Sequence, residues 1–190
     1  QVVNPREGEI MFGLNLVVHK GKTIFVADTS VHEYPTSEQM SEIAISSARV
    51  VRLFGFDPKV AFVSHSTFGQ PITSRTKHIK KAVDILKEKN VDFEFDGDMQ
   101  PDVALNKDYK DLYPFSNIVG NANILIMPGQ HSAAISYKMM KELGDTKVIG
   151  PLLVGLGLPI EIAPLRTSTS ELINLASIAA YSADVIDYDK

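Results

Sequence analysis

The chain has 190 residues, 44% hydrophobic and 22% charged, so it can bury a core without covalent crosslinks. The net charge of -4 gives no general attraction for nucleic acid, and the lack of cysteine excludes disulfides and fits a reducing compartment. No apolar run approaches the roughly 20 residues that a membrane-spanning helix needs. We expect a cytoplasmic protein without nucleic-acid or membrane partners. Its start at Gln1 favours a fragment of a longer chain.

Two antiparallel strands are predicted first, at residues 13–18 and 23–27, because these apolar runs flank a glycine-containing turn. A helix is predicted next. Thr36 and Gln39 have the spacing of a capping box, apolar residues recur at helical spacing, and Gly55 provides a C-terminal stop.

Strand–loop–helix units follow, and their alternation predicts an α/β sheet covered by helices. The expected strands or extended segments are residues 60–63, 93–95, 124–127 and 160–163. The expected helices are 132–143, 169–181 and a helix after the loop 64–71, one face of which is marked by Ile79, Ala82, Val83 and Leu86. No repeat or linker divides the chain. The acidic segment 184–189 is predicted to be a solvated end.

The first candidate site is the loop 64–71, which is rich in small and hydroxyl residues and precedes a helix carrying Arg75. Loops that follow strands in α/β sheets bring helix N–H groups to anions, so this loop is suited to phosphate or pyrophosphate. The alternative is a simple helix cap with a solvated basic face.

The second candidate is the segment 165–171, where hydroxyls, Arg166 and Glu171 precede the last helix and are suited to an acyl phosphate or a CoA thioester. Ser168 and Glu171 also have capping-box spacing, so Glu171 has a purely structural alternative. In the third candidate, 128–132, we expect Ser132 to be a helix cap and His131 a surface side chain.

Metal binding and serine-hydrolase chemistry receive little support from the sequence. The five histidines are scattered without the spacings that bring metal ligands together, and no cysteine can join them. No G-x-S-x-G motif is present. We therefore predict no metal site, while a triad assembled only in three dimensions stays open.

Several motifs together resemble the second half of a phosphate acetyltransferase domain, in order and in spacing. They are FVADTSV at 25–31, FGFDPKVA at 54–61, SHSTFG at 64–69, DGDMQ at 96–100, GNANILIMP at 120–128 and GPLLVGL at 150–156. The likeness extends over most of residues 11–181 and includes two branches, the free-standing acetyltransferases and the C-terminal domains of large bacterial malic enzymes.

The segment before the last helix separates these branches. The acetyltransferases resemble one another in a Ser-Arg-Gly-Cys-Ser stretch, whose serine and arginine hold the transition state, followed by an acid that accepts the CoA thiol proton. Aligned on Glu171, those two positions are Pro164 and Leu165 here, and Arg166 comes one place later. Loss of such an arginine removes stabilisation of developing charge. The resemblance therefore favours the malic enzyme branch.

This resemblance implies that residues 1–190 are the C-terminal part of a phosphotransacetylase-like domain, with the catalytic malic enzyme domains upstream and absent. The implied fold is a three-layer α/β sandwich of the isopropylmalate-dehydrogenase-like kind, with a mostly parallel sheet and an antiparallel hairpin. The implied parent oxidises malate to pyruvate with NADP and Mg²⁺ or Mn²⁺, in a larger oligomer built on dimers of this domain.

For this segment the resemblance implies an acetyl-CoA sensor that inhibits by feedback, without a cofactor or catalytic residues of its own. The alternatives are a working phosphate acetyltransferase, which makes acetyl-CoA from acetyl phosphate, and a purely structural dimerisation domain. The residues expected to contact phosphate or pantetheine are Ser66, Thr67, Gly69 and Arg75. Those expected at the thioester end are Arg166, Thr167, Ser168 and Glu171.

Overall fold

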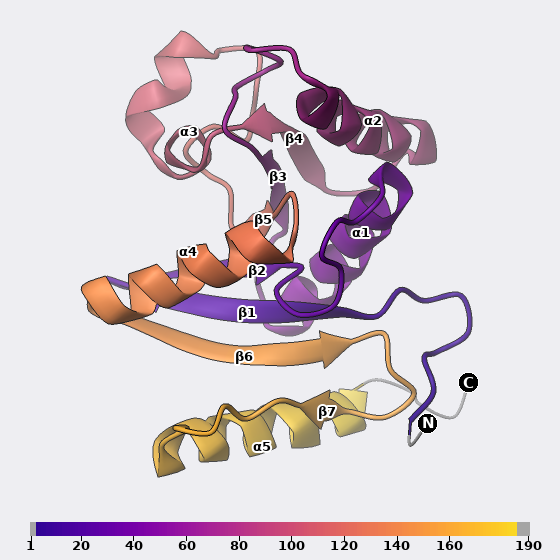
Figure 1. Ribbon diagram of the computed structural model, residues 1–190, viewed down its shortest axis with the longest axis vertical. Helices are drawn as coiled ribbons and strands as arrows, with labels where there is room; N and C mark the ends of the chain where they lie inside the picture. Colours follow the sequence, from indigo (N-terminus) through magenta and orange to yellow (C-terminus); the bar gives the residue numbers. More distant parts are fainter. Residues whose placement is uncertain (1–2, 186–190) are drawn as a thin grey trace.

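A seven-stranded sheet forms the centre of the computed structural model, which describes residues 3–185 (Figure 1). The strands are β1 (Phe12–His19), β2 (Lys22–Ala27), β3 (Lys59–Val63), β4 (Glu94–Met99), β5 (Ile124–Ile126), β6 (Thr146–Val154) and β7 (Ile160–Glu161). Their order is β4-β3-β5-β2-β1-β6-β7. The first four in this order are parallel, whereas β1, β6 and β7 join by antiparallel pairing.

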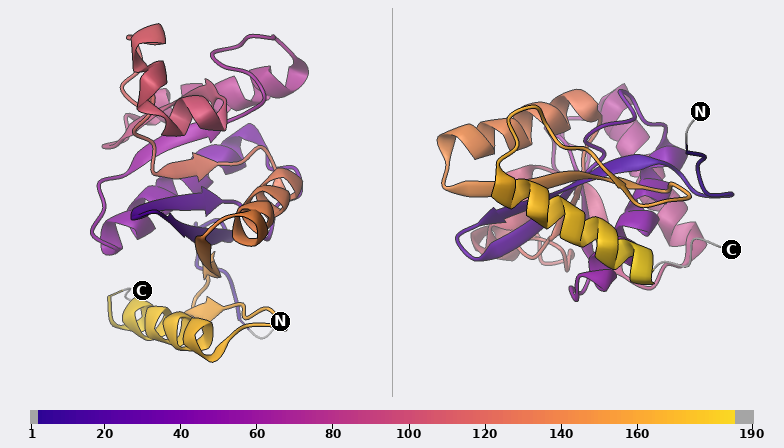
Figure 2. Two further views of the ribbon diagram at one scale, coloured as in Figure 1. Left: turned by 90° about the vertical axis from the view of Figure 1, so that its left-hand side faces the viewer. Right: turned by 90° about the horizontal axis from the view of Figure 1, so that it is seen from below.

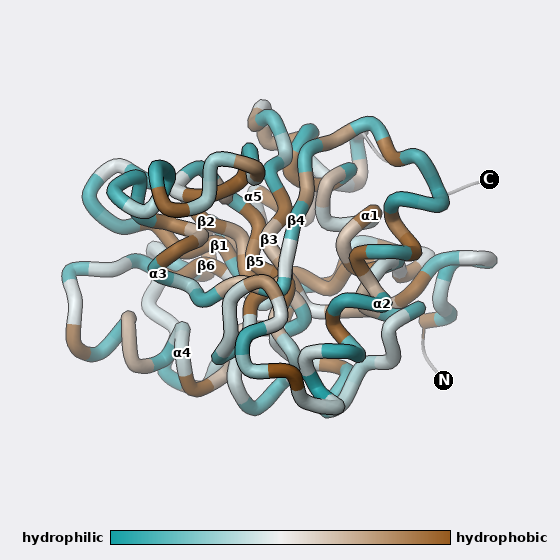
Figure 3. The backbone as a smooth tube through the Cα atoms, turned by 90° about the horizontal axis from the view of Figure 1, so that it is seen from above, coloured by the Kyte–Doolittle hydropathy of each residue, from teal (hydrophilic) through white to brown (hydrophobic). Residues whose placement is uncertain are grey.

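Helices cover both faces of the sheet, which confirms the predicted α/β fold with three layers. They are α1 (Ser37–Leu53), α2 (Ser74–Lys89), α3 (Pro101–Leu105), the 3-10 helix η1 (Lys107–Leu112), α4 (Gln130–Leu143) and α5 (Thr169–Val185). One apolar core joins the sheet to α1, α2 and the inner side of α5. A second core joins the opposite face to α3 and α4. Figure 3 shows the apolar strands at the centre, with polar loops around them.

The predicted hairpin and first helix are confirmed, and local chemistry explains both. Lys20 and Gly21 form the two-residue turn between β1 and β2, each with positive φ, as a type I′ turn requires. At the start of α1, the backbone N–H of Gln39 donates to the Thr36 hydroxyl at 3.1 Å, and the Gln39 side chain accepts from the Thr36 N–H at 2.8 Å. This is the predicted capping box.

The antiparallel part of the sheet is larger than the predicted hairpin, because β6 was not predicted. Its interior contains Gly150 and Pro151, which normally interrupt a strand. In the structure they lie beside a register shift in β1 between Leu14 and Leu16, where an irregular ladder tolerates a proline without an N–H group. The short helices α3 and η1 were also missed, and β7 ends at Glu161 rather than at residue 163.

α5 lies at the β7 end of the sheet, far from α2 and β4 (Figures 1 and 2). It continues to Val185, beyond the predicted end at residue 181, and most of the predicted acidic end at 184–189 lies outside the described residues. Within residues 3–185, no helix has the length and apolar character needed to cross a membrane.

Candidate functional site

The topology singles out the carboxyl ends of β3 and β5 as the place for a ligand. These strands are parallel neighbours. From β3 the chain passes through α2 to β4, at one edge of the sheet. From β5 it passes through α4 in the opposite direction, to β6, which lies beyond β2 and β1. Ligands of open α/β sheets bind where successive connections diverge in this way.

A pocket of about 290 Å³ lies at this end of the sheet. Three segments line it: the loop after β2, the first turns of α2 and the loop after β5. The lining residues are Tyr34 and Pro35 from the first segment, Ser74, Arg75, His78 and Ile79 from the second, and Pro128 from the third. Arg75 is exposed and forms no ion pair with any residue of the described chain. The pocket therefore combines apolar walls with an unpaired cation at a helix N-terminus, an arrangement that suits an anionic organic ligand.

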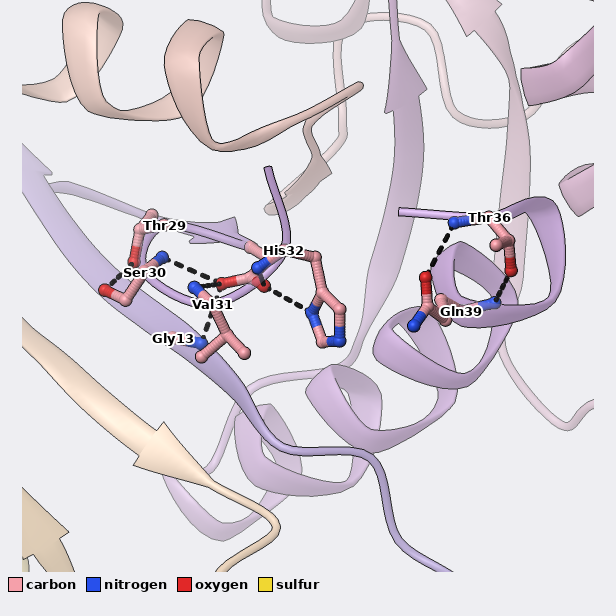
Figure 4. A network of polar contacts seen from close by, with 8 residues as sticks. Gly13, Thr29, Ser30, Val31, His32, Thr36 and Gln39 are labelled. Carbon is pink, nitrogen blue, oxygen red and sulfur yellow. Dashed lines mark hydrogen bonds and ion pairs between the residues drawn. The ribbon is translucent and has the colours of Figure 1, made fainter. Parts of the chain in front are cut away.

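The wall formed by the β2–α1 loop is fixed by the carboxylate of Asp28, which is 1% exposed. It accepts hydrogen bonds from the backbone N–H groups of Gly13, Ser30, Val31 and His32 at 2.7–3.1 Å (Figure 4). The His32 ring lies 2.7 Å from the same carboxylate through Nδ1. Such a carboxylate holds the turn rigidly, because its lone pairs are used by backbone donors.

Further contacts tie this loop to α2. His78 Nε2 lies 2.9 Å from the carbonyl oxygen of Pro35, and His78 Nδ1 lies 3.0 Å from the Ser37 hydroxyl. The Ser37 hydroxyl donates to the carbonyl oxygen of His78 at 2.8 Å. The two walls of the pocket are thus connected by side chains rather than meeting by packing alone.

The first predicted group of ligand contacts is Ser66, Thr67, Gly69 and Arg75, and its members have different environments. Ser66 is 0% exposed, and its hydroxyl donates to Asp98, so it shapes the loop and does not face solvent. The Gly69 N–H also donates to Asp98, at 2.9 Å, and the Thr67 hydroxyl accepts from the Gln100 N–H at 3.2 Å. Only Arg75 of this group lines the pocket.

The second predicted group surrounds the N-terminus of α5. Ser168 and Glu171 form the capping box that was the structural alternative, with the Ser168 N–H donating to Glu171 at 2.7 Å. Lys141 also lies 3.1 Å from the Glu171 carboxylate. Hydrogen bonds from Ser168 and Lys141 lower the pKa of Glu171 to about 2. Thr167 donates to Pro164, while Arg166 is exposed without a bonded partner among residues 3–185.

The structure does not bring the two predicted groups together within one chain. The loop after β3 lies at the carboxyl edge of the parallel strands. The start of α5 is paired with Lys141 near the end of α4, which lies at the opposite edge, where β6 begins. β3 and β7 are also five positions apart in the sheet, about 24 Å at the usual strand spacing.

In the third candidate loop, the prediction of Ser132 as a helix cap is wrong, because α4 begins at Gln130, its N-cap is Gly129, and no side chain of the described residues caps it. His131 is a surface side chain, as predicted. The Ser132 hydroxyl donates to the Gly129 carbonyl oxygen at 2.9 Å, and exposed His131 lies 3.2 Å from Glu33. Across residues 3–185, no three His, Asp or Glu side chains gather in a way that could hold a metal ion. Pro128 belongs to this third candidate loop and lines the pocket. Tyr34 was missed, although it lies in the loop that follows a predicted strand, where ligands gather.

Comparison with known proteins shows which family the sequence and fold of this chain match. The model of the phosphate acetyl/butaryl transferase family matches residues 1–180. The chain belongs to this family. A phosphotransacetylase from Streptococcus pyogenes has the same fold, with a TM-score of 0.90 and 29% identity over 97% of this chain and 57% of that one.

Malic enzymes and acetyltransferases are both among the relatives. The NADP-dependent malic enzyme of Rhizobium meliloti (strain 1021) is 46% identical over 181 residues, which are 95% of this chain and 24% of that enzyme. The phosphate acetyltransferase of Bacillus subtilis (strain 168) is 32% identical over 185 residues, 96% of this chain and 57% of that protein. The chain thus spans about a quarter of such malic enzymes. The resemblance to their phosphotransacetylase-like C-terminal domain is confirmed.

Proposed function

We propose that this chain is the acetyl-CoA-binding regulatory domain of an NADP-dependent malic enzyme and that acetyl-CoA bound to it inhibits the enzyme. The observation that carries the proposal is the pocket at the diverging ends of β3 and β5, with the unpaired guanidinium of Arg75 at its rim. Arg75 and the N-terminus of α2 supply positive charge for phosphate groups. Pro35, Ile79 and Pro128 supply an apolar wall for the organic part of the ligand.

The rival function is phosphate acetyltransferase activity, which the similarity to the Bacillus subtilis enzyme favours. Two features argue against it. Pro164 and Leu165 are exposed apolar residues at the positions where a serine and an arginine are expected in those enzymes. Glu171, the expected proton acceptor, has a pKa of about 2 and is already bonded to Ser168 and Lys141. Such a carboxylate is a weak base at neutral pH.

The second predicted group enters this proposal through a neighbouring subunit. Because Arg166 lies at the opposite edge of the sheet from Arg75, it reaches acetyl-CoA only if another copy of the chain, or another domain of the enzyme, supplies one side of the site. We propose a homodimer through this domain and a larger oligomer of the whole enzyme. Leu172 and Ile173 on α5, 47% and 61% exposed, offer apolar surface for such a contact.

The whole enzyme would act in the cytoplasm, where its other domains would bind NADP and Mg²⁺ or Mn²⁺ and oxidise malate. Effector binding changes activity only to the extent that acetyl-CoA binds one arrangement of the oligomer more tightly than another. Inhibition by acetyl-CoA and binding of acetyl-CoA should therefore be lost together.

Calorimetric titration of the intact enzyme with acetyl-CoA, and with free CoA for comparison, tests the proposal. Arg75→Ala should weaken acetyl-CoA binding on the order of tenfold or more, because a charge-assisted hydrogen bond is lost. Lys77→Ala is the matched control, since Lys77 is an exposed cation of α2 outside the pocket lining. Absence of binding to the unchanged enzyme, or turnover of acetyl phosphate and CoA, would overturn the regulatory function.

A further inference from the structure

Three aromatic rings meet beside the loop that follows β3. The ring centroids of Phe68 and Tyr113 are 5.3 Å apart, those of Phe68 and Phe115 are 4.8 Å apart, and those of Tyr113 and Phe115 are 6.2 Å apart. We call these three residues the aromatic trio. Phe115 is 68% exposed, so the trio presents an open ring to solvent.

The backbone of Phe68 adopts a conformation that a bulky residue rarely takes. Its φ is +51°, in the left-handed region, and that of the next residue, Gly69, is +81°. Buried Asp98 holds this turn, because its carboxylate accepts from the Ser66 hydroxyl and the Gly69 N–H, and its carbonyl oxygen accepts from the Phe68 N–H at 2.6 Å. Strain fixed by surrounding contacts is concentrated at ligand sites and switches.

The trio and the pocket share one connection of the chain. Phe68 lies in the loop between β3 and α2, and the same loop leads to Arg75 at the pocket rim. Both features lie at the carboxyl edge of the parallel strands. A ligand with phosphate groups at Arg75 and a flat ring near Phe115 would therefore use two parts of one ligand-binding edge.

We propose that the adenine ring of acetyl-CoA stacks on Phe115, with Phe68 and Tyr113 holding that ring in place. The proposal rests on the acetyl-CoA-binding function proposed above and adds the location of the nucleotide end. Stacking needs only the face of a ring, and every purine base offers one. Arg75 then contacts phosphate groups of the same molecule.

Calorimetry on the intact malic enzyme, with acetyl-CoA and S-acetyl-4′-phosphopantetheine, tests this assignment. The second probe carries the acetyl thioester without adenosine. Phe115→Ala should weaken acetyl-CoA binding about ten- to a hundredfold, the usual range for a lost base–aromatic stack, and leave the pantetheine probe unchanged. Leu112→Ala is the matched control, because Leu112 is 67% exposed in the same segment but outside the trio. It should alter neither affinity.

A fluorescence experiment provides a direct readout of stacking. The chain has no tryptophan, so Phe115→Trp introduces the sole indole of this domain. In the isolated chain, titration with acetyl-CoA should quench its emission, and the pantetheine probe should not. The Phe115→Trp variant of the intact enzyme should also retain an acetyl-CoA affinity close to that of the unchanged enzyme, because tryptophan offers a ring face for stacking as phenylalanine does.

The outcomes separate the two proposals. If unchanged enzyme binds no acetyl-CoA, the regulatory function itself is wrong. If acetyl-CoA binds but Phe115→Ala has no effect, the function survives and the stacking proposal is wrong. An adenosine-dependent loss in Tyr34→Ala alone would place the base in the pocket instead. A changed oligomeric state in Phe115→Ala with unaltered affinity would make the trio a subunit contact.

Discussion

Glu161 on β7 should make the chain less stable as the pH rises. Its Oε2 atom is buried and has no hydrogen-bond partner among the described residues. Burial raises the pKa of this carboxyl to about 8, against an opposing backbone hydrogen bond from Leu153. The folded state therefore keeps a proton that the unfolded state releases near the ordinary pKa of a glutamate, 4.5. Stability should be highest below that value and fall until about pH 8.

The size of the effect follows from the same difference in pKa. At about 1.4 kcal/mol per pKa unit, the full difference between the folded and unfolded pKa would lower the free energy of unfolding by about 5 kcal/mol between pH 4.5 and pH 8. Glu161 is only half-buried, so water screens its charge, and we expect about 1–2 kcal/mol. Glu161→Gln keeps the shape of the side chain without its charge. It should remove most of the loss of stability between pH 6.5 and pH 8.5.

Urea unfolding of both proteins at these two pH values measures the effect. The free energy of unfolding of the Gln variant should exceed that of the unchanged chain at pH 8.5, with a smaller difference at pH 6.5. Glu171→Gln is the control, because the pKa of Glu171 is about 2 and this carboxyl stays ionised throughout the range. If Glu161→Gln and the unchanged chain lose stability in parallel, burial of Glu161 is not the source of the pH dependence.

Three further substitutions test the local structure by urea unfolding. Asp28→Asn should cost about 2–4 kcal/mol, because a buried acceptor of the His32 N–H is replaced by an amide; an unchanged stability would contradict the role of this network. Gly13→Ala should cost about 1–3 kcal/mol, since its new Cβ would lie 2.7 Å from Ser30 Cβ; a neutral result would mean that the loop moves freely. Ser168→Ala should cost about 1 kcal/mol as a lost helix cap, and a loss of acetyl-CoA affinity without a loss of stability would instead make Ser168 a ligand contact.

Elements defined by neighbouring residues could be predicted from the sequence. The turn at Lys20 and Gly21 depends on two residues, and the start of α1 depends on Thr36 and Gln39. Their hydrogen bonds are local, so the sequence pattern and the structure carry the same information. The same is true of the cap formed by Ser168 and Glu171, where the structural alternative could be stated from spacing alone.

Features that depend on distant partners could not be predicted in this way. β6 contains Gly150 and Pro151, and its place in the sheet depends on the irregular pairing with β1, more than a hundred residues earlier. The direction of β7 relative to β3 determines which edge of the sheet Arg166 approaches. The residues around Arg166 do not indicate the direction of β7. The loops 64–71 and 165–171 were therefore assigned to one site on the basis of their similar chemistry.

The environment of each polar side chain separates structural roles from binding roles in this chain. Ser66 is small and polar beside a predicted anion site, yet it is buried and donates to Asp98. Glu171 is likewise engaged by Ser168 and Lys141. Arg75 differs, because it lines the pocket without a partner in the described chain. A group already bonded within the protein must give up that bond to hold a ligand, whereas an unpaired guanidinium gives up only water. For this reason Arg75 is the residue on which the proposed binding of acetyl-CoA should depend most.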